Sequence, residues 1–218
     1  MQRKLTGILA GAVFLIAIVS IQRHFRPALP QINPAIFATF GQVLADETVK
    51  AVAGHGRIVA VINAQQQLAG NPAHAELDHF QAALRKHNLI SLLATEVLPV
   101  DADELVIGAG CSAAQLQAIL TKYTAADAIV FLIGLPEWGT LQARGMIPQP
   151  GSTKIIVAVD GVVPTKTEYG GYFANGFLSV LIGMQPGSAG TVKPRTSQEW
   201  LDKHCQIYTA QNADTLPE

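Results

Sequence analysis

A glycine-rich stretch, Leu105–Ala114, holds the one pattern in this 218-residue chain that could bind a cofactor. Gly108, Gly110 and Ala113 have the spacing of a dinucleotide-binding fingerprint, in which glycines let a pyrophosphate approach the backbone at a helix N-terminus. An acidic residue, Glu137, follows the next strand-like run, where a ribose contact would be expected. Two other strand-like runs come first, however, whereas this fingerprint usually opens its domain. We therefore expect a glycine turn that precedes a helix, and no cofactor.

The other chemically active side chains do not complete a site in the sequence. His74 and Asp78 stand one helical turn apart with His79 beside them, but zinc needs three or four converging ligands. We expect no metal site, and because no nucleophile elbow or P-loop occurs, we expect no catalytic residue. The two cysteines, Cys111 and Cys205, either pair as a disulfide or stay as separate buried thiols.

Short apolar runs alternate with helical patterns along most of the chain. The run Ala128–Gly134 is β-branched and uncharged, as in a strand that is covered on both faces. We therefore predict a three-layer α/β/α domain with a mainly parallel sheet of about five strands. Its strands are expected at Arg57–Asn63, Leu89–Leu98, Ala128–Gly134, Lys154–Asp160 and Phe177–Gly183, and its helices at Ala35–Ala53, Ala73–His87, Ser112–Tyr123 and Ser197–Tyr208, with a short one at Glu137–Gly145.

The first residues predict a membrane anchor. Leu5–Ile21 is uncharged and follows Arg3 and Lys4, and its length would span about 25 Å as a helix, enough for a bilayer core. A cleaved signal peptide is the alternative. Flanking charges are nearly balanced, and we favour the N-terminus inside, with the domain on the extracytoplasmic, periplasmic side.

The rest of the chain divides by composition. We expect an anchor over residues 1–22, a proline-rich linker over 23–34, the α/β domain over 35–187, and a tail with one short helix over 188–218. The formal net charge of −1 provides no electrostatic footprint for nucleic acid. Hydrophobic residues make up 49% of the chain, which suits buried strands or additional surface buried against partners.

From Gly56 to Gly187 the order of these runs resembles one lobe of type I periplasmic-binding-protein-like domains, the fold of LacI-type ligand-binding halves. The similar stretches are Gly56–Ile62, Phe80–Leu84, Ala126–Phe131, Ile155–Gly161 and Phe177–Gly187. Such proteins bind a small molecule between two lobes, whereas this chain has room for one, so a partner or second copy would have to complete the clamp. The resemblance implies ligand contacts in the loops after the strands, at Asn63, Gln65, Glu137 and Asp160; the other interpretation is ordinary turn chemistry.

Three hypotheses for function follow. The first is a non-catalytic, membrane-anchored accessory or scaffolding subunit that binds other proteins of a membrane complex. The alternative is a tethered solute-binding or sensor domain built on a single periplasmic-binding-protein-like lobe. A nucleotide-dependent enzyme that uses the glycine-rich stretch is the third. The aromatic cluster Tyr169–Phe173, with Trp138 and Trp200, suits either a protein interface or a buried lid over the sheet ends.

Overall fold

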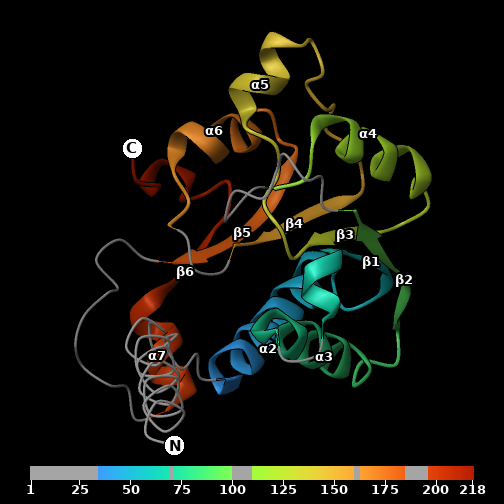
Figure 1. The fold of residues 1–218 in the computed structure, drawn as a ribbon, viewed down its shortest axis with the longest axis vertical. Helices are drawn as coiled ribbons and strands as arrows, with labels where there is room; N and C mark the ends of the chain where they lie inside the picture. Colours follow the sequence, from blue (N-terminus) through green and yellow to red (C-terminus); the bar gives the residue numbers. More distant parts are fainter. Residues whose placement is uncertain (1–33, 69–70, 100–109, 160–162, 185–195) are drawn as a thin grey trace, which may run out of the picture. The chain divides into compact units, whose positions relative to one another are not determined.

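The computed structural model describes residues 34–68, 71–99, 110–159, 163–184 and 196–218. Six strands form one sheet in the order β2-β1-β3-β4-β5-β6 (Figure 1). The first five are parallel, and β6 runs antiparallel to β5. The strands are β1 (Gly56–Asn63), β2 (Ile90–Leu98), β3 (Ala128–Phe131), β4 (Lys154–Ala158), β5 (Leu178–Met184) and β6 (Cys205–Tyr208).

Hydrophobic side chains on both faces make the centre of this sheet. The five residues Ile58–Ile62 of β1 have no exposed surface, and all four residues of β3 are buried. β-branched residues that alternate between two covered faces are typical of parallel strands between helical layers. The predicted α/β domain with a mainly parallel sheet is confirmed, with one strand more than expected.

Helices cover the two faces of the sheet as separate layers (Figure 1). One layer holds α2 (Pro34–Ala51), α3 (Pro72–Leu84) and α7 (Ser197–His204), and the other holds α4 (Ala113–Lys122), α5 (Trp138–Ala143) and α6 (Lys166–Ala174). The chain moves from β1 outward to β2 and then returns past β1 to β3. Since right-handed crossovers in opposite directions lie on opposite faces, this reversal creates a topological switch point between β1 and β3.

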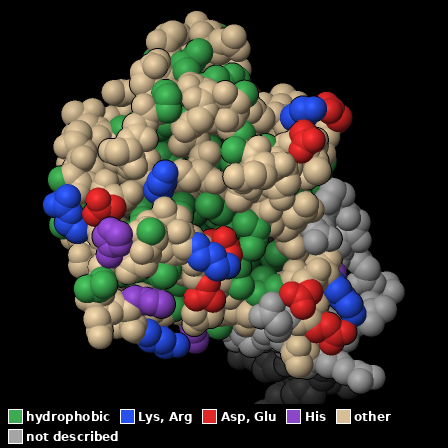
Figure 2. Space-filling model, turned by 180° about the vertical axis from the view of Figure 1, so that it is seen from behind, with side chains coloured by type: hydrophobic (Ala, Val, Ile, Leu, Met, Phe, Trp, Pro, Cys, Tyr) green, Lys and Arg blue, Asp and Glu red, His purple; other side chains and the backbone are tan. Residues whose placement is uncertain are grey.

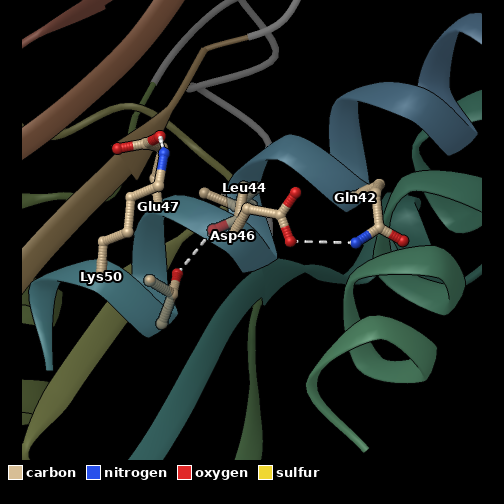
Figure 3. A network of polar contacts seen from close by, with 6 residues as sticks. Gln42, Leu44, Asp46, Glu47 and Lys50 are labelled. Atoms are coloured by element: carbon tan, nitrogen blue, oxygen red, sulfur yellow. Dashed lines mark hydrogen bonds and ion pairs between the residues drawn. The ribbon is translucent and has the colours of Figure 1, made fainter. Parts of the chain in front are cut away.

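Helices α2 and α3 pack closely because Gly41 has no side chain. A Cβ at this position would lie 2.2 Å from the carbonyl oxygen of Glu76. The outer face of α2 is polar, and its side chains bond to one another (Figure 3). Gln42 donates to Asp46 at 3.1 Å, and Lys50 pairs with Glu47 at 2.6 Å. Contacts of this i,i+3 and i,i+4 kind stabilise a helix only modestly.

Two elements differ from the sequence-based expectations. The helix predicted over Ser197–Tyr208 ends at His204, and the next four residues form β6, in which Tyr208 pairs with Leu181 of β5. The glycine-containing stretch around Tyr169–Phe173 lies in helix α6. The C-terminal segment 196–218 adds buried hydrophobic side chains to the domain, namely Leu201, Tyr208 and Leu216.

The two cysteines lie on opposite sides of the sheet. Cys111 belongs to the hydrophobic cluster under α4, α5 and α6, whereas Cys205 packs against the cluster under α2 and α3. They are therefore not joined, and the disulfide considered from the sequence is not formed. Burial raises the pKa of the Cys205 thiol to about 12, with a smaller contribution from the charge of Glu76.

No helix in the described ranges is long and apolar enough to cross a membrane. The anchor predicted over Leu5–Ile21 lies outside the described residues.

Candidate functional site

The switch point brings together two loops at the carboxyl ends of β1 and β3. The chain after β1 forms the 3-10 turn η1 (Ala64–Gln67), and the chain after β3 runs through Gly134 and Pro136 into α5. In an open α/β sheet, ligands bind in the crevice beyond the strand ends at such a point. We therefore take these two loops as the candidate site.

Asn63 and Gln66 close the loop after β1. The Asn63 side-chain oxygen accepts from the Gln66 backbone N–H at 3.0 Å, and the Gln66 side-chain oxygen accepts from the Asn63 backbone N–H at 2.9 Å. The Gln66 side-chain nitrogen donates to the carbonyl oxygen of Leu132 at 2.7 Å. Gln66 is buried, so this one side chain fixes the end of β1 against the end of β3. Among the described residues, the side-chain N–H groups of Asn63 have no partner, so they can serve as donors to a ligand.

We expect Gln66→Leu to lower the free energy of unfolding by about 1–3 kcal/mol, because it leaves the buried carbonyl of Leu132 and the partly buried N–H of Asn63 without their hydrogen bonds. The neighbouring Gln65 is exposed, and Gln65→Leu should change the free energy by less than about 0.5 kcal/mol. Urea denaturation of the two variants measures the difference. Equal effects would contradict the role given to Gln66.

A close backbone contact holds the loop after β3 from one side. The backbone N–H of Cys111 donates to the carbonyl oxygen of Gly134 at 2.9 Å, and a Cβ on Gly110 would lie 2.3 Å from that oxygen. The next residue, Ser112, caps α4 through a reciprocal capping box with Gln115. The close contact with Gly134 thus explains why residue 110 is a glycine. The capping box satisfies backbone N–H groups at the start of α4. Of the predicted fingerprint, Ala113 is buried as the first residue of α4, and Gly108 lies outside the described residues.

Aromatic residues of α6 hold the same loop from the other side. Tyr172 is fully buried and donates from its hydroxyl to the carbonyl oxygen of Pro136 at 2.7 Å. The ring of Trp138 meets the Tyr172 ring edge-on, with centroids 4.9 Å apart. A Cβ on Gly171 would lie 2.3 Å from the indole, so the indole packs directly on the α6 backbone. Burial raises the pKa of both Tyr169 and Tyr172, which keeps these hydroxyls protonated.

Glu137 and Trp138 are the side chains of this loop that reach the surface. Glu137 is exposed and stands at the N-cap of α5 without a side-chain capping bond; among the described residues, its carboxylate accepts from the Thr140 hydroxyl at 3.5 Å. Trp138 is half-buried. An exposed carboxylate beside an aromatic ring can accept hydrogen bonds from a polar ligand while the ring packs on the ligand's apolar face.

The structure does not bring the other predicted site residues together in the same way. Gln65 is exposed, and its backbone oxygen accepts from the Asn71 side chain at 2.9 Å. Asp160 lies outside the described residues. The His74 ring stands 3.5 Å from the Asp78 carboxylate on the exposed side of α3, and within the described ranges no cluster of three metal-ligating side chains forms.

Two cavities among the described residues lie away from this site. A groove of about 400 Å³ runs between α2, α7 and β6, and a second of about 470 Å³ lies between α6 and the C-terminal segment. Seen from behind, the surface shows hydrophobic side chains between charged ones (Figure 2). The first groove has an apolar floor and acidic walls, formed by Val43, Asp46, Glu47, Lys50, Ile182, Leu201, Asp202, Cys205, Gln206 and Ile207.

No family model and no curated protein sequence matches this chain. Solved structures do match it in fold. A sugar-binding protein of a Bacillus halodurans ABC transporter has a TM-score of 0.55 and 18% identity, over 83% of this chain and 64% of its own. A Burkholderia graminis ABC-transporter solute-binding protein, solved with D-arabinose, has a TM-score of 0.55 and 14% identity, over 83% of this chain and 62% of its own.

A third match is the fructose-binding periplasmic domain of a hybrid two-component system, with a TM-score of 0.51 and 17% identity, over 83% of this chain and 59% of its own. The chain thus spans about three fifths of the length of these structures. At such identities the likeness concerns the fold. The strand order and these matches together show that the chain has the fold of a type I periplasmic-binding-protein-like lobe, as the sequence resemblance predicted.

Proposed function

We propose that this domain binds a small neutral polar solute of the monosaccharide class at the carboxyl ends of β1 and β3. The observation that carries the proposal is the presence of an exposed carboxylate and a half-buried indole at consecutive positions, Glu137 and Trp138, on a loop fixed from both sides at the switch point. A sugar offers hydroxyl groups to the carboxylate and to the Asn63 amide, and a C–H face to the ring. Three of the matching structures are described as binding sugars, which supports this ligand class.

The proposal includes a tether. Residues 1–22 would anchor the domain on the periplasmic side, where the linker of residues 23–34 lets it meet solutes. Support comes from the apolar run Leu5–Ile21 and from the description of one matching structure as a periplasmic domain of a two-component system. The matches favour solute binding over the scaffolding hypothesis, for which the described residues supply no specific observation.

The test is a thermal-shift screen of the full chain, solubilised in detergent, with D-arabinose, D-fructose, D-glucose and D-galactose. A ligand at about 100 times its dissociation constant stabilises a protein by about 2.7 kcal/mol, which corresponds to roughly 5–10 °C for a domain of this size. We expect at least one sugar to give such a shift. Trp138→Ala and Glu137→Gln should each reduce the affinity about tenfold or more, measured by calorimetry.

Asp46→Asn is the matched control, since it also removes one surface carboxylate but lies on α2 in the other helical layer (Figure 3). It should leave sugar binding unchanged. The absence of a shift with every sugar would contradict the proposal, as would a shift that survives both Trp138→Ala and Glu137→Gln.

A further inference from the structure

The strand β2 forms an open side of the sheet. In the part of the chain that the structure describes, β2 pairs with β1 alone, so the outer N–H and C=O groups of its nine residues are without a strand partner. Such a row of backbone groups is a template for pairing with another chain. At the other end of the sheet the edge strand is β6, which has only four residues and pairs antiparallel with β5.

This open strand carries exposed hydrophobic side chains. Leu93, in the middle of β2, is 49% exposed, and Leu89, directly before the strand, is 74% exposed. Among the described residues, only Leu68 is a third large hydrophobic side chain with this exposure, and it follows β1 at another part of the sheet. Two of the three therefore lie along one strand edge.

The usual protections of an edge are weak on this strand. It contains no proline and no lysine, and its single charged residue, Glu96, is held by the Lys122 ammonium group at 2.7 Å and by the Tyr123 hydroxyl of the segment ending α4. One protection is present: the pairing with β1 skips Leu93, since Leu92 faces Ile58 and Ala94 faces Val59. This bulge interrupts the hydrogen-bond ladder between β1 and β2 at Leu93. The extra residue in the bulge is a half-exposed leucine, whereas a charged residue there would protect the edge better.

Charges in the sequence favour one orientation of a partner strand. Arg85, Lys86 and His87 precede β2, whereas Asp101, Asp103 and Glu104 follow it in the sequence. Two copies of β2 paired in parallel would place their starts, which follow the basic residues in the sequence, side by side. Antiparallel pairing instead places the start of β2 in one copy beside the end of β2 in the other, which precedes acidic residues in the sequence, and it is also the pairing that a two-fold axis requires.

We propose that this chain forms a symmetric homodimer through antiparallel pairing of β2 with β2 of a second copy, with the two-fold axis at Leu93. In this register Leu93 meets Leu93 of the second copy, Ser91 lies opposite Thr95, and Leu89 lies opposite Val97. The two six-stranded sheets become one continuous sheet of twelve strands. The contact lies along the side of the sheet, so it leaves the carboxyl ends of β1 and β3 accessible and does not depend on the proposed ligand.

The first test measures the mass of the detergent-solubilised full chain by light scattering during size-exclusion chromatography, between about 1 and 100 µM protein. We expect a monomer–dimer equilibrium. Leu93→Lys should raise the dissociation constant of the dimer about tenfold or more, because it places two cations at the axis. Leu68→Lys is the matched control, a lysine at an exposed leucine away from β2, and it should leave the dimer unchanged.

The second test fixes the register. Leu93→Cys should give a covalent dimer under mild oxidation, and Leu68→Cys should not, with the native Cys111 and Cys205 present in both variants. Circular dichroism should show native spectra for every variant, since both leucines are about half-exposed or more. A monomer at every concentration would overturn the proposal, as would a dimer that Leu93→Lys leaves intact, which would place the contact elsewhere, for example in residues 1–33.

Discussion

Gly110→Ala is expected to lower the free energy of unfolding by about 3 kcal/mol or more and to disturb the candidate site with it. The added methyl carbon would lie 2.3 Å and 2.4 Å from the carbonyl oxygen and carbon of Gly134, and 2.5 Å from the carbonyl oxygen of Leu135. All three are backbone atoms, so no side chain can rotate away, and overpacking of this kind is costly. Either α4 or the loop after β3 must move, and the hydrogen bond from Cys111 to Gly134 is weakened or lost.

Gly139→Ala is the control for Gly110→Ala. Gly139 lies in helix α5, and a Cβ there would meet nothing within 4 Å. Alanine should therefore be neutral or stabilise the domain by up to about 1 kcal/mol, because glycine is a poor helix residue. Urea denaturation of both variants provides the comparison. A Gly110→Ala protein with wild-type stability would show that the two loops are not in the contact described.

Replacement of Tyr172 is expected to have an effect of similar size. Tyr172→Ala should lower the free energy of unfolding by about 3–5 kcal/mol, since it leaves a cavity at a fully buried position among the rings of Trp138, Tyr169 and Phe177. It also removes the hydroxyl that holds Pro136. We therefore expect the loop with Glu137 and Trp138 to become mobile, with faster amide hydrogen exchange at residues 134–140.

Tyr172→Phe separates these two contributions. It keeps the ring and removes only the hydrogen bond to Pro136, so the free energy of unfolding should fall by about 1–2 kcal/mol. If Tyr172→Phe and Tyr172→Ala were equally destabilised, ring packing would contribute little and the aromatic cluster would not position the loop. Hydrogen exchange in the remote strand β2 should stay unchanged in Tyr172→Phe.

The strands of this fold could be predicted from the sequence because they are hydrophobic on both faces. Runs such as Ile58–Ile62 and Ala128–Phe131 have no amphipathic helical period and end at turn residues, which is the local signature of a buried parallel strand. The five predicted strands are all present. Their parallel order followed from the alternating helices, and in such a sheet the strand ends are where a ligand site is expected.

Helix α6 was missed because Gly170 and Gly171 favour a loop in isolation. Gly171 is needed there because the indole of Trp138 packs on the helix backbone, a contact with a residue far away in the chain. A usable signal was present nevertheless: Thr165 and Glu168 have the spacing of a capping box, and the structure shows that box at the start of α6.

Strand β6 and the role of Gln66 could not be predicted for the same reason, because both depend on contacts with residues far away in the chain. Cys205–Tyr208 becomes a strand because it pairs with β5, and four residues have too little pattern of their own to predict this. Gln65 and Gln66 are neighbours of the same residue type, and only the path of η1 decides that the second is buried against Leu132. Sequence reasoning chose the first of the two.

The position of β1 between β2 and β3 also affects the order of folding. The unit β1–α3–β2 consists of consecutive elements and can form early, but the other edge of β1 stays open until β3 pairs with it, since Ile58 pairs with Ala128, far away in the chain. Until then the hydrophobic run Ile58–Ile62 has one unpaired edge, which exposes it to incorrect strand pairing.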